Sequence, residues 1–297
     1  MVVTGNSGQP GAPCIRGLQA DIRPKQIHNT PSKQGGVMNR VGGVVNAALI
    51  GLTLLLMPLT QAEDNKVDIK EVIKLAEQGD VGSQYLLGIG YELGWAGLPQ
   101  DDKKAFSWYR KSAEQGDADA QYSIAMMYLK GKGITQNNKN ALTWFIKSAE
   151  QGNVSAQINT GVIYGNGLGV TKNHKQAIKW FLKAAEQGNS EAQFKVAYHY
   201  MNGLGVLKDH KKAFHWLLKS AEQGFAISQG AVGGYYGDGI GVPQDLVKAY
   251  AWFSVATANG VEDFMSSRDN TAQRLTPDQL AKGQELAATY FEKYQPQ

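Results

Sequence analysis

The stretch QINTGVIYGNGLGVTKNHKQAIKWFLKAAEQG, residues 157–188, decides the fold. Its second half places Ala177, Trp180 and Phe181 at i, i+3 and i+4, a spacing that puts all three on one face of an α-helix. A Gly-x-Gly turn at residues 167–169 separates this half from an apolar half that precedes it. We therefore expect two helices joined by a short turn, which favours antiparallel neighbours.

The same pattern recurs along the chain at a nearly constant spacing. Tryptophan falls every 36 residues, at Trp108, Trp144, Trp180, Trp216 and Trp252. The phrase Ala-Glu-Gln-Gly ends at Gly79, Gly116, Gly152, Gly188 and Gly224, and an altered form ends at Gly260. A fixed period of this length is the signature of a repeat architecture. We expect an all-α solenoid of five two-helix repeats with boundaries at 80–116, 117–152, 153–188, 189–224 and 225–260.

Polar residues mark where each helix begins. Seven residues before each Trp stands a side chain that can accept from free N–H groups of the first turn: Asp101, Asn137, Asn173, Asp209 and Asp245. The recurring Gly tolerates the left-handed conformation that ends a helix. Asp80, Asp117, Asn153 and Asn189 follow it and can cap the next helix, whereas the fifth copy has Phe225 there and is expected to lose the cap.

Each first helix carries a small residue at one position. These residues are Gly88, Ala125, Gly161, Ala197 and Gly233. Glycine inside a helix costs about 1 kcal/mol relative to alanine. We expect close approach of the paired helix to compensate, with the Trp ring opposite the small residue.

Both ends of the array look adapted to close it. Val67 to Gln78 resembles a second helix without its Trp, and residues 63–79 are expected to form an N-terminal capping helix. Residues 261–297 are expected to form C-terminal capping helices, because Thr276-Pro277-Asp278-Gln279 is a capping box with Pro at the first helical position. Terminal repeats need a polar outer face, since they lack one neighbour.

The first 62 residues predict targeting rather than fold. Basic Arg40 precedes an uncharged apolar run from Val41 to Met57, and small residues precede a possible cut after Ala62. This is the anatomy of a secretory signal peptide at residues 38–62. It predicts a periplasmic or secreted protein; an inner-membrane anchor and a buried core helix stay open as alternatives. Residues 1–37 have no period and are expected to be an unstructured upstream segment, with translation starting at Met38.

Charge and cysteine content exclude several classes of function. From Glu63 onward the chain has 25 basic and 25 acidic residues, so we expect no global attraction to nucleic acid or to an anionic membrane. The single cysteine, Cys14, excludes a disulfide framework within the chain.

These residues resemble the Sel-one-like repeat (SLR) family, a relative of tetratricopeptide repeats. The copy from Gln157 to Tyr164, then Gly167 to Gly169, then Ala177 to Gly188 carries the clearest match, and the resemblance covers residues 80–260. It implies a right-handed superhelix of helical hairpins that acts as an adaptor or scaffold. Many bacterial members are exported and contact envelope enzymes or host proteins. A cysteine-rich branch was linked with penicillin binding or β-lactamase activity, but residues 63–297 contain no cysteine.

Catalytic and metal-binding patterns are missing from the sequence. It contains no Ser-x-x-Lys, Ser-Asp-Asn, Lys-Thr-Gly or Gly-x-Ser-x-Gly. His174 and His210 occupy the same position one repeat apart, just after a helix cap, and are expected to be solvated rather than metal ligands. We predict that the chain is not an enzyme and has no catalytic residue, metal or cofactor. A β-lactamase-like enzyme and a regulator of a periplasmic hydrolase are the alternatives.

The expected partner is a protein or peptide, bound by a monomer on the concave surface that the first helices line. By resemblance to tetratricopeptide repeats, the groove-facing candidates are Tyr85, Ile89, Tyr122, Met126, Ile158, Val162, Phe194 and Tyr198, while the fifth copy offers Gly230 and Gly234. Aromatic residues and Met are frequent interface anchors. Packing between adjacent first helices is the competing interpretation of these side chains.

Overall fold

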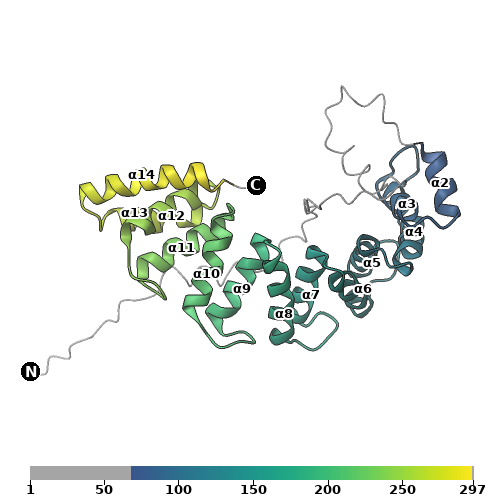
Figure 1. The fold of residues 1–297 in the computed structure, drawn as a ribbon, viewed down its shortest axis with the longest axis horizontal. Coiled ribbons are helices and arrows are strands. Elements are labelled where there is room, and N and C mark those ends of the chain that lie inside the picture. The colour runs from purple at the N-terminus through teal and green to yellow at the C-terminus, as the bar shows by residue number, and fades with distance from the viewer. Residues whose placement is uncertain (1–67, 296–297) are drawn as a thin grey trace, which may run out of the picture. The chain divides into compact units, whose positions relative to one another are not determined.

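The computed structural model describes residues 68–295, and the regular structure in this range is helical. The expected repeat of helix-turn-helix hairpins is confirmed (Figure 1). By their contacts the described residues divide into two units, residues 68–183 and 184–295, with the boundary inside one helix. The predicted signal peptide and upstream segment lie outside the described residues. Within the described range, no helix has the length and apolar character needed to cross a bilayer.

The first unit is a row of hairpins preceded by one helix. Its helices are α2 (Ile69–Glu77), α3 (Val81–Leu93), α4 (Asp102–Glu114), α5 (Ala118–Lys130), α6 (Asn138–Glu150), α7 (Val154–Asn166) and most of α8 (His174–Glu186). Helix α2 corresponds to the predicted N-terminal cap. Helices α3, α5 and α7 are the first helices of their repeats, and α4, α6 and α8 are the second helices.

The second unit continues the repeat and ends in additional helices. It contains α9 (Ser190–Asn202), α10 (His210–Ala221), α11 (Ala226–Asp238), α12 (Leu246–Ala258), the 3₁₀ helix η2 (Glu262–Phe264), α13 (Met265–Ala272) and α14 (Pro277–Lys293). Helix α14 packs on α12. It begins with the predicted capping box, in which Thr276 and Gln279 each bond the other's backbone.

The predicted helix ends agree with the structure. The Asp101 side chain accepts from the backbone N–H groups of Lys103 and Lys104 at 3.0 Å, and its counterpart Asp245 accepts from that of Lys248. Phe225 makes no side-chain cap bond, as expected. Every recurring Gly that ends a second helix has a positive φ, from 82° to 101°, in the left-handed range that favours glycine.

In the first, third and fifth repeats the small residue of the first helix faces a ring, but the prediction that this ring is the Trp is wrong. A Cβ on Gly88 would lie 2.3 Å from Tyr109, and one on Gly161 would lie 2.5 Å from Phe181. The facing residue therefore follows the Trp by one position. One residue is about 100° of helical rotation, which turns the Trp toward the preceding hairpin, where Trp144 packs against Tyr109 and its neighbours. Trp108, Trp144 and Trp216 are consequently half-buried, whereas Trp180 and Trp252 are buried.

A ladder of buried glutamines ties successive hairpins together. In each repeat the glutamine of the first helix donates to a carbonyl eight residues earlier, as Gln121 Nε2 does to Ala113 O at 3.1 Å. The side-chain oxygen of Gln121 accepts from Gln151 Nε2 of the next Ala-Glu-Gln-Gly at 2.9 Å, and in the fifth repeat Asn259 Nδ2 donates to Gln229 instead. Five glutamines donate in this way: Gln84, Gln121, Gln157, Gln193 and Gln229. The repeated Gln of Ala-Glu-Gln-Gly therefore has a structural role that the sequence analysis did not assign.

Candidate functional site

The first helices present the predicted partner-binding side chains in a half-buried state. We call the set Tyr85, Ile89, Tyr122, Ile158, Val162, Phe194 and Tyr198 the first-helix face; each of these side chains is partly exposed. Met126, which was predicted with them, is only 7% exposed and belongs to the core of its hairpin. Phe194 and Tyr198 lie in the second unit and the other five in the first, so each unit carries its own part of this face.

The aromatic residues of the first-helix face also pack within their hairpins. The ring centroids of Tyr85 and Tyr109 are 5.6 Å apart, and those of Tyr122 and Phe145 are 5.7 Å apart. Each Tyr thus has one side against the second helix of its own repeat and keeps some exposed surface. These residues therefore contribute to packing within their hairpins and keep part of their surface exposed, and their role in partner binding stays a prediction.

Polar groups lie among these apolar side chains. Burial, and then the charge of Asp119 on α5, raises the pKa of the Tyr85 hydroxyl above its ordinary value. The Asp119 carboxylate also accepts from Asn153 Nδ2 at 2.9 Å. A neutral hydroxyl beside a carboxylate provides hydrogen-bonding capacity at the edge of an apolar surface. This combination suits a peptide, which brings both apolar side chains and backbone donors.

In the fifth repeat a separate segment covers the corresponding position. Gly230 stands where the other copies carry Tyr85, Tyr122, Ile158 and Phe194. A Cβ on Gly230 would lie 2.0 Å from the ring of Phe264, a buried residue of η2. The Phe264 ring also stacks on Phe253 of α12, with centroids 5.9 Å apart. Phe264 therefore supplies the aromatic side chain that Gly230 lacks, and the repeat pattern of the sequence gave no sign of this residue.

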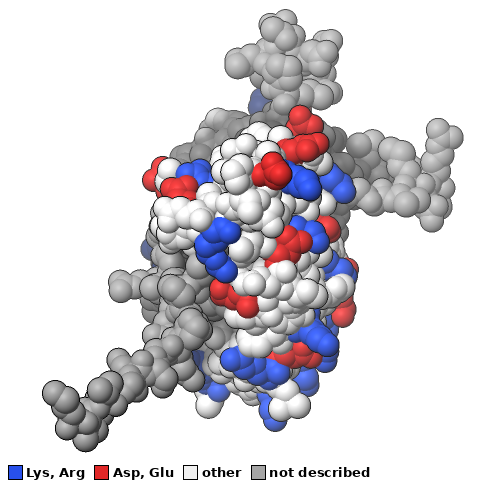
Figure 2. Space-filling view, turned by 90° about the vertical axis from the view of Figure 1, so that its left-hand side faces the viewer, with Lys and Arg blue, Asp and Glu red and all other residues white. Residues whose placement is uncertain are grey.

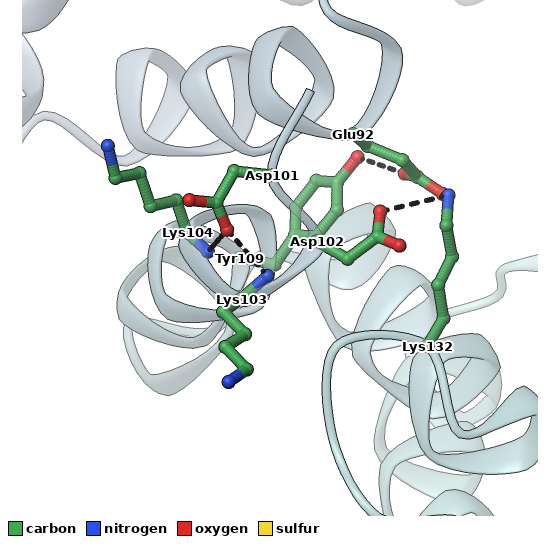
Figure 3. Close-up of polar contacts among 7 residues, drawn as sticks. All are labelled: Glu92, Asp101, Asp102, Lys103, Lys104, Tyr109 and Lys132. Carbon is green, nitrogen blue, oxygen red and sulfur yellow. Dashed lines mark hydrogen bonds and ion pairs between the residues drawn. The ribbon is translucent and has the colours of Figure 1, made fainter. Parts of the chain in front are cut away.

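A polar cluster joins the first and second repeats (Figure 3). Tyr109 donates its hydroxyl hydrogen to Glu92 Oε2 at 2.7 Å. Lys132 Nζ lies 3.1 Å from Glu92 Oε1 and 3.3 Å from Asp102 Oδ1. The loop after α5 is thereby tied to α3 and α4. The remaining contacts in Figure 3, those of Asp101, belong to the cap of α4.

The ionisation of this cluster opposes a role in acid–base chemistry. Burial, and then the charge of Glu92, raises the pKa of Tyr109 well above its ordinary value. Partial burial acts to lower the pKa of Lys132, but the hydrogen bonds and charges of Glu92 and Asp102 outweigh it and raise that pKa. At neutral pH the phenol is protonated and the lysine is charged, so neither is a base. The cluster is best explained as a tie between repeats.

The sequence contained a signal for this cluster that spacing alone could reveal. Tyr109 stands where the other copies have Phe145, Phe181, Leu217 and Phe253. Lys132 stands where three other copies have Leu168, Leu204 and Ile240. Tyr109 and Lys132 are polar residues at two positions that are apolar in other repeats, and this shared exception indicates that the two residues lie in the same local environment.

Between residues 68 and 295, no three His, Cys, Asp or Glu side chains come together as a metal site would require. His210 Nδ1 lies 3.2 Å from the Tyr235 hydroxyl, and burial, then the charge of Lys208, lowers the pKa of His210. On the face shown in Figure 2, acidic and basic side chains are interspersed among uncharged ones.

Two of the solved structures that resemble this chain are repeat proteins. A protective antigen of uropathogenic Escherichia coli strains, which displays an SLR fold, is 42% identical with a TM-score of 0.66, over 76% of this chain and 48% of that one. This chain therefore spans about half the length of that antigen. A Sel1 repeat protein from Oxalobacter formigenes is 29% identical with a TM-score of 0.67, over 82% of this chain and 99% of that one.

Comparison with families and with curated proteins gives two further results. None of the curated proteins compared with the chain matches it. The family model described as Sel1 repeat matches residues 81–117, 118–153, 154–189, 190–225 and 226–261, each starting one residue after a boundary expected from the sequence. With five consecutive matches that cover more than half of its length, the chain belongs to the Sel1 repeat family.

Proposed function

We propose that this protein is an exported adaptor that binds a protein or peptide along the first-helix face. Sel1 repeat proteins generally mediate protein–protein interactions and are generally non-catalytic. The half-buried aromatic and aliphatic side chains of α3, α5, α7 and α9 support this choice of surface, since exposed apolar residues with polar neighbours are typical of interaction sites.

The fifth repeat provides the observation that carries the proposal. There the segment that contains Phe264 lies against α11, with its ring on Gly230 and Phe253. The first helix of a Sel1 repeat thus accepts an apolar side chain from a separate piece of backbone. A partner segment that crosses α3, α5 or α7 would meet Tyr85, Tyr122 and Ile158 at the same repeat position.

Site-specific photo-crosslinking tests the choice of surface. A photoreactive phenylalanine analogue at Tyr122 or Phe194 should yield protein crosslinks in native envelopes. The matched control is Thr143, an exposed residue on the second helix of the same repeat as Tyr122. Equal crosslinking to protein from Thr143, or none from Tyr122 and Phe194, would contradict the proposal.

Substitution then tests whether these contacts provide affinity. Tyr122→Ala and Phe194→Ala should each weaken capture of the crosslinked partner by about tenfold to thirtyfold, a usual range for an interface anchor. Far-UV circular dichroism should stay helical, and Thr143→Ala should change neither readout. Unchanged capture by both variants would rule out the first-helix face.

Export is proposed from the sequence of residues 38–62. The sequence pattern predicts cleavage after Ala62, so the mature chain should begin at Glu63. N-terminal sequencing of protein recovered from the periplasm or medium tests this step separately from binding. A cytoplasmic chain that retains residues 38–62 would remove the export part and leave the binding part standing.

A further inference from the structure

Seven lysines lie on the exposed side of the three second helices in the 68–183 unit. Positions i, i+4 and i+8 from the first turn of α4, α6 and α8 are all exposed, and all are lysine except Ser107 and Thr143. We call this set the lysine face: Lys103, Lys111, Lys139, Lys147, Lys175, Lys179 and Lys183. Acidic residues stand at the ends of these helices: Asp102 begins α4, and Glu114, Glu150 and Glu186 end α4, α6 and α8.

The three stripes belong to neighbouring helices. Phe106 of α4 and Trp144 of α6 line one surface hollow. Trp180 of α8 lies in one core cluster with Leu142 and Phe145 of α6. Four residues of helix rise by about 6 Å, which is the spacing of lysines along one stripe. The lysines therefore form a two-dimensional array rather than a single line.

Helix stability does not explain this arrangement. Lys103, Lys139 and Lys175 stand in the first turn of their helices, where the positive end of the helix dipole disfavours a cation. Lys179 stands four residues after Lys175 and four before Lys183, and like charges at this spacing repel each other.

Ring contacts account for only part of the set. The ammonium groups of Lys111, Lys147 and Lys183 lie 3.8, 4.1 and 4.1 Å from the ring centroids of the Trp residues three positions earlier. The other four lysines of the face have positions that the helix itself disfavours, so an explanation outside the fold is needed.

Charge is concentrated locally in a chain that is balanced as a whole. Residues 120–183 contain eight lysines, five of which belong to the lysine face, and one acidic residue, Glu150. Of the other three, Lys132 is paired with Glu92 and Asp102 from outside this range. The 25 basic and 25 acidic residues from Glu63 onward give a net charge of zero for that part of the chain as a whole, but they are not evenly distributed along it. The balanced total charge predicts no attraction of the whole chain to an anionic surface, but a local group of lysines can still be attracted to one.

We infer that the lysine face docks on the surface of an anionic lipid bilayer. Lysine is a compact point charge and lacks the planar fork with which arginine recognises single carboxylates or phosphates. An array spread over three helices, with only Ser107 and Thr143 between the charges, matches a surface of distributed charge better than one extended acidic segment. Lysines beside such a membrane are attracted individually and their contributions add. This surface lies on the second helices, so it leaves the first-helix face available for the proposed partner.

Vesicle sedimentation with the full chain tests the inference. The variant Lys139→Gln, Lys175→Gln, Lys179→Gln removes three lysines that have no ring contact. The control Lys70→Gln, Lys208→Gln, Lys282→Gln removes the same charge from exposed positions elsewhere. The probes are vesicles of phosphatidylcholine with 30% phosphatidylglycerol and vesicles of phosphatidylcholine alone, which measure what the apolar run of residues 41–57 contributes by itself.

The wild-type chain should prefer the anionic vesicles, and 0.5 M salt should abolish the preference because salt screens exposed charges. The lysine-face variant should bind them on the order of 100-fold more weakly, since each lysine contributes about fivefold. The control variant should lose less than tenfold. Equal losses in both variants, or no preference of the wild type for anionic vesicles, would overturn the inference. Binding to polyglutamate but not to anionic vesicles would replace the membrane with an acidic protein and also overturn it.

Discussion

The first four repeats and the fifth differ in what covers their tryptophan. In the first four, a lysine three residues later lies over the ring, as Lys183 does 4.1 Å from Trp180. In the fifth, Val255 replaces that lysine, and Tyr290 and Tyr294 lie 4.6 and 5.4 Å from Trp252. The ring of the repeated Trp can thus be covered either by a solvated lysine or by an apolar helix. Cover by an apolar helix ends the repeat pattern, because α14 packs on the surface of α12 that stays exposed on the second helices of the other repeats.

The same contrast appears in the first helices. Tyr85 and Tyr122 bring their own rings to positions where the fifth repeat has Gly230 and receives Phe264. The fifth repeat is therefore finished on both of its helices by residues from beyond position 260. We expect its stability to depend on these C-terminal residues, whereas the first four repeats depend on neighbouring repeats.

Truncation of the two kinds of tryptophan should give the largest difference. Trp252→Ala should cost about 4 kcal/mol, because the ring is only 2% exposed and lies against α14. Trp144→Ala should cost about half as much, since that ring is half-buried. Urea unfolding measures the total, and hydrogen exchange of the α12 amides locates it. Equal costs would show that α14 adds nothing to the burial of Trp252.

The glutamine ladder should show the next largest difference. Gln229 Nε2 donates to Tyr294 O at 3.1 Å in addition to Ala221 O, whereas Gln121 Nε2 donates to the Ala113 carbonyl. Unpaired buried polar groups cost about 1–3 kcal/mol each, so Gln229→Ala should cost about 3 kcal/mol and Gln121→Ala about 2. Thermal unfolding of the two variants compares them, and a smaller shift for Gln229→Ala would refute the tie to the C-terminus.

Two glycines four residues apart on α11 offer a matched pair. A Cβ on Gly230 meets the Phe264 ring at 2.0 Å, whereas one on Gly234 meets nothing within 4 Å. Gly230→Ala should therefore cost about 2 kcal/mol by overpacking. Gly234→Ala should stabilise the chain by up to about 1 kcal/mol, because alanine is the better helix former. Proteolysis near Phe264 should accelerate in the first variant only; resistance in both would mean that Phe264 does not depend on Gly230.

Much of the fold could be predicted from the sequence because the same local pattern of caps and glycines occurs in all five repeats. Caps such as Asp101, the positive-φ glycines and the capping box at Thr276 depend on contacts within a few residues, so a local pattern is enough to predict them. The ring opposite Gly88 was assigned to the wrong residue, because one position of helical rotation separates Trp108 from Tyr109 and a periodic pattern cannot distinguish two adjacent large rings.

The candidate sites were harder to predict because they depend on residues that differ from the repeat pattern or lie outside it. Phe264 lies beyond the last copy, so periodicity says nothing of its contact with Gly230. The partners of Lys132 come from α3 and α4, and only the stacking of hairpins brings them together. Met126 was predicted to face the groove but is buried, because its position turns far enough toward α6 to join the core of its hairpin.

Removing a lysine from above a ring should have the smallest effect. Lys183→Met should cost about 0.5 kcal/mol by loss of the cation–π contact with Trp180, which is weak where the ammonium is exposed. Lys179→Met is the matched control on the same helix: it removes the same charge without a ring contact, and relief of repulsion from Lys175 and Lys183 should make it neutral or slightly stabilising. Urea unfolding at two salt concentrations separates the two contributions, because repulsion between exposed charges is screened while the ring contact largely persists. If both variants lose the same free energy of unfolding, the lysines over the tryptophans of the first four repeats add no stability. Of the two kinds of cover, lysine and α14, only α14 would then stabilise the Trp that it covers.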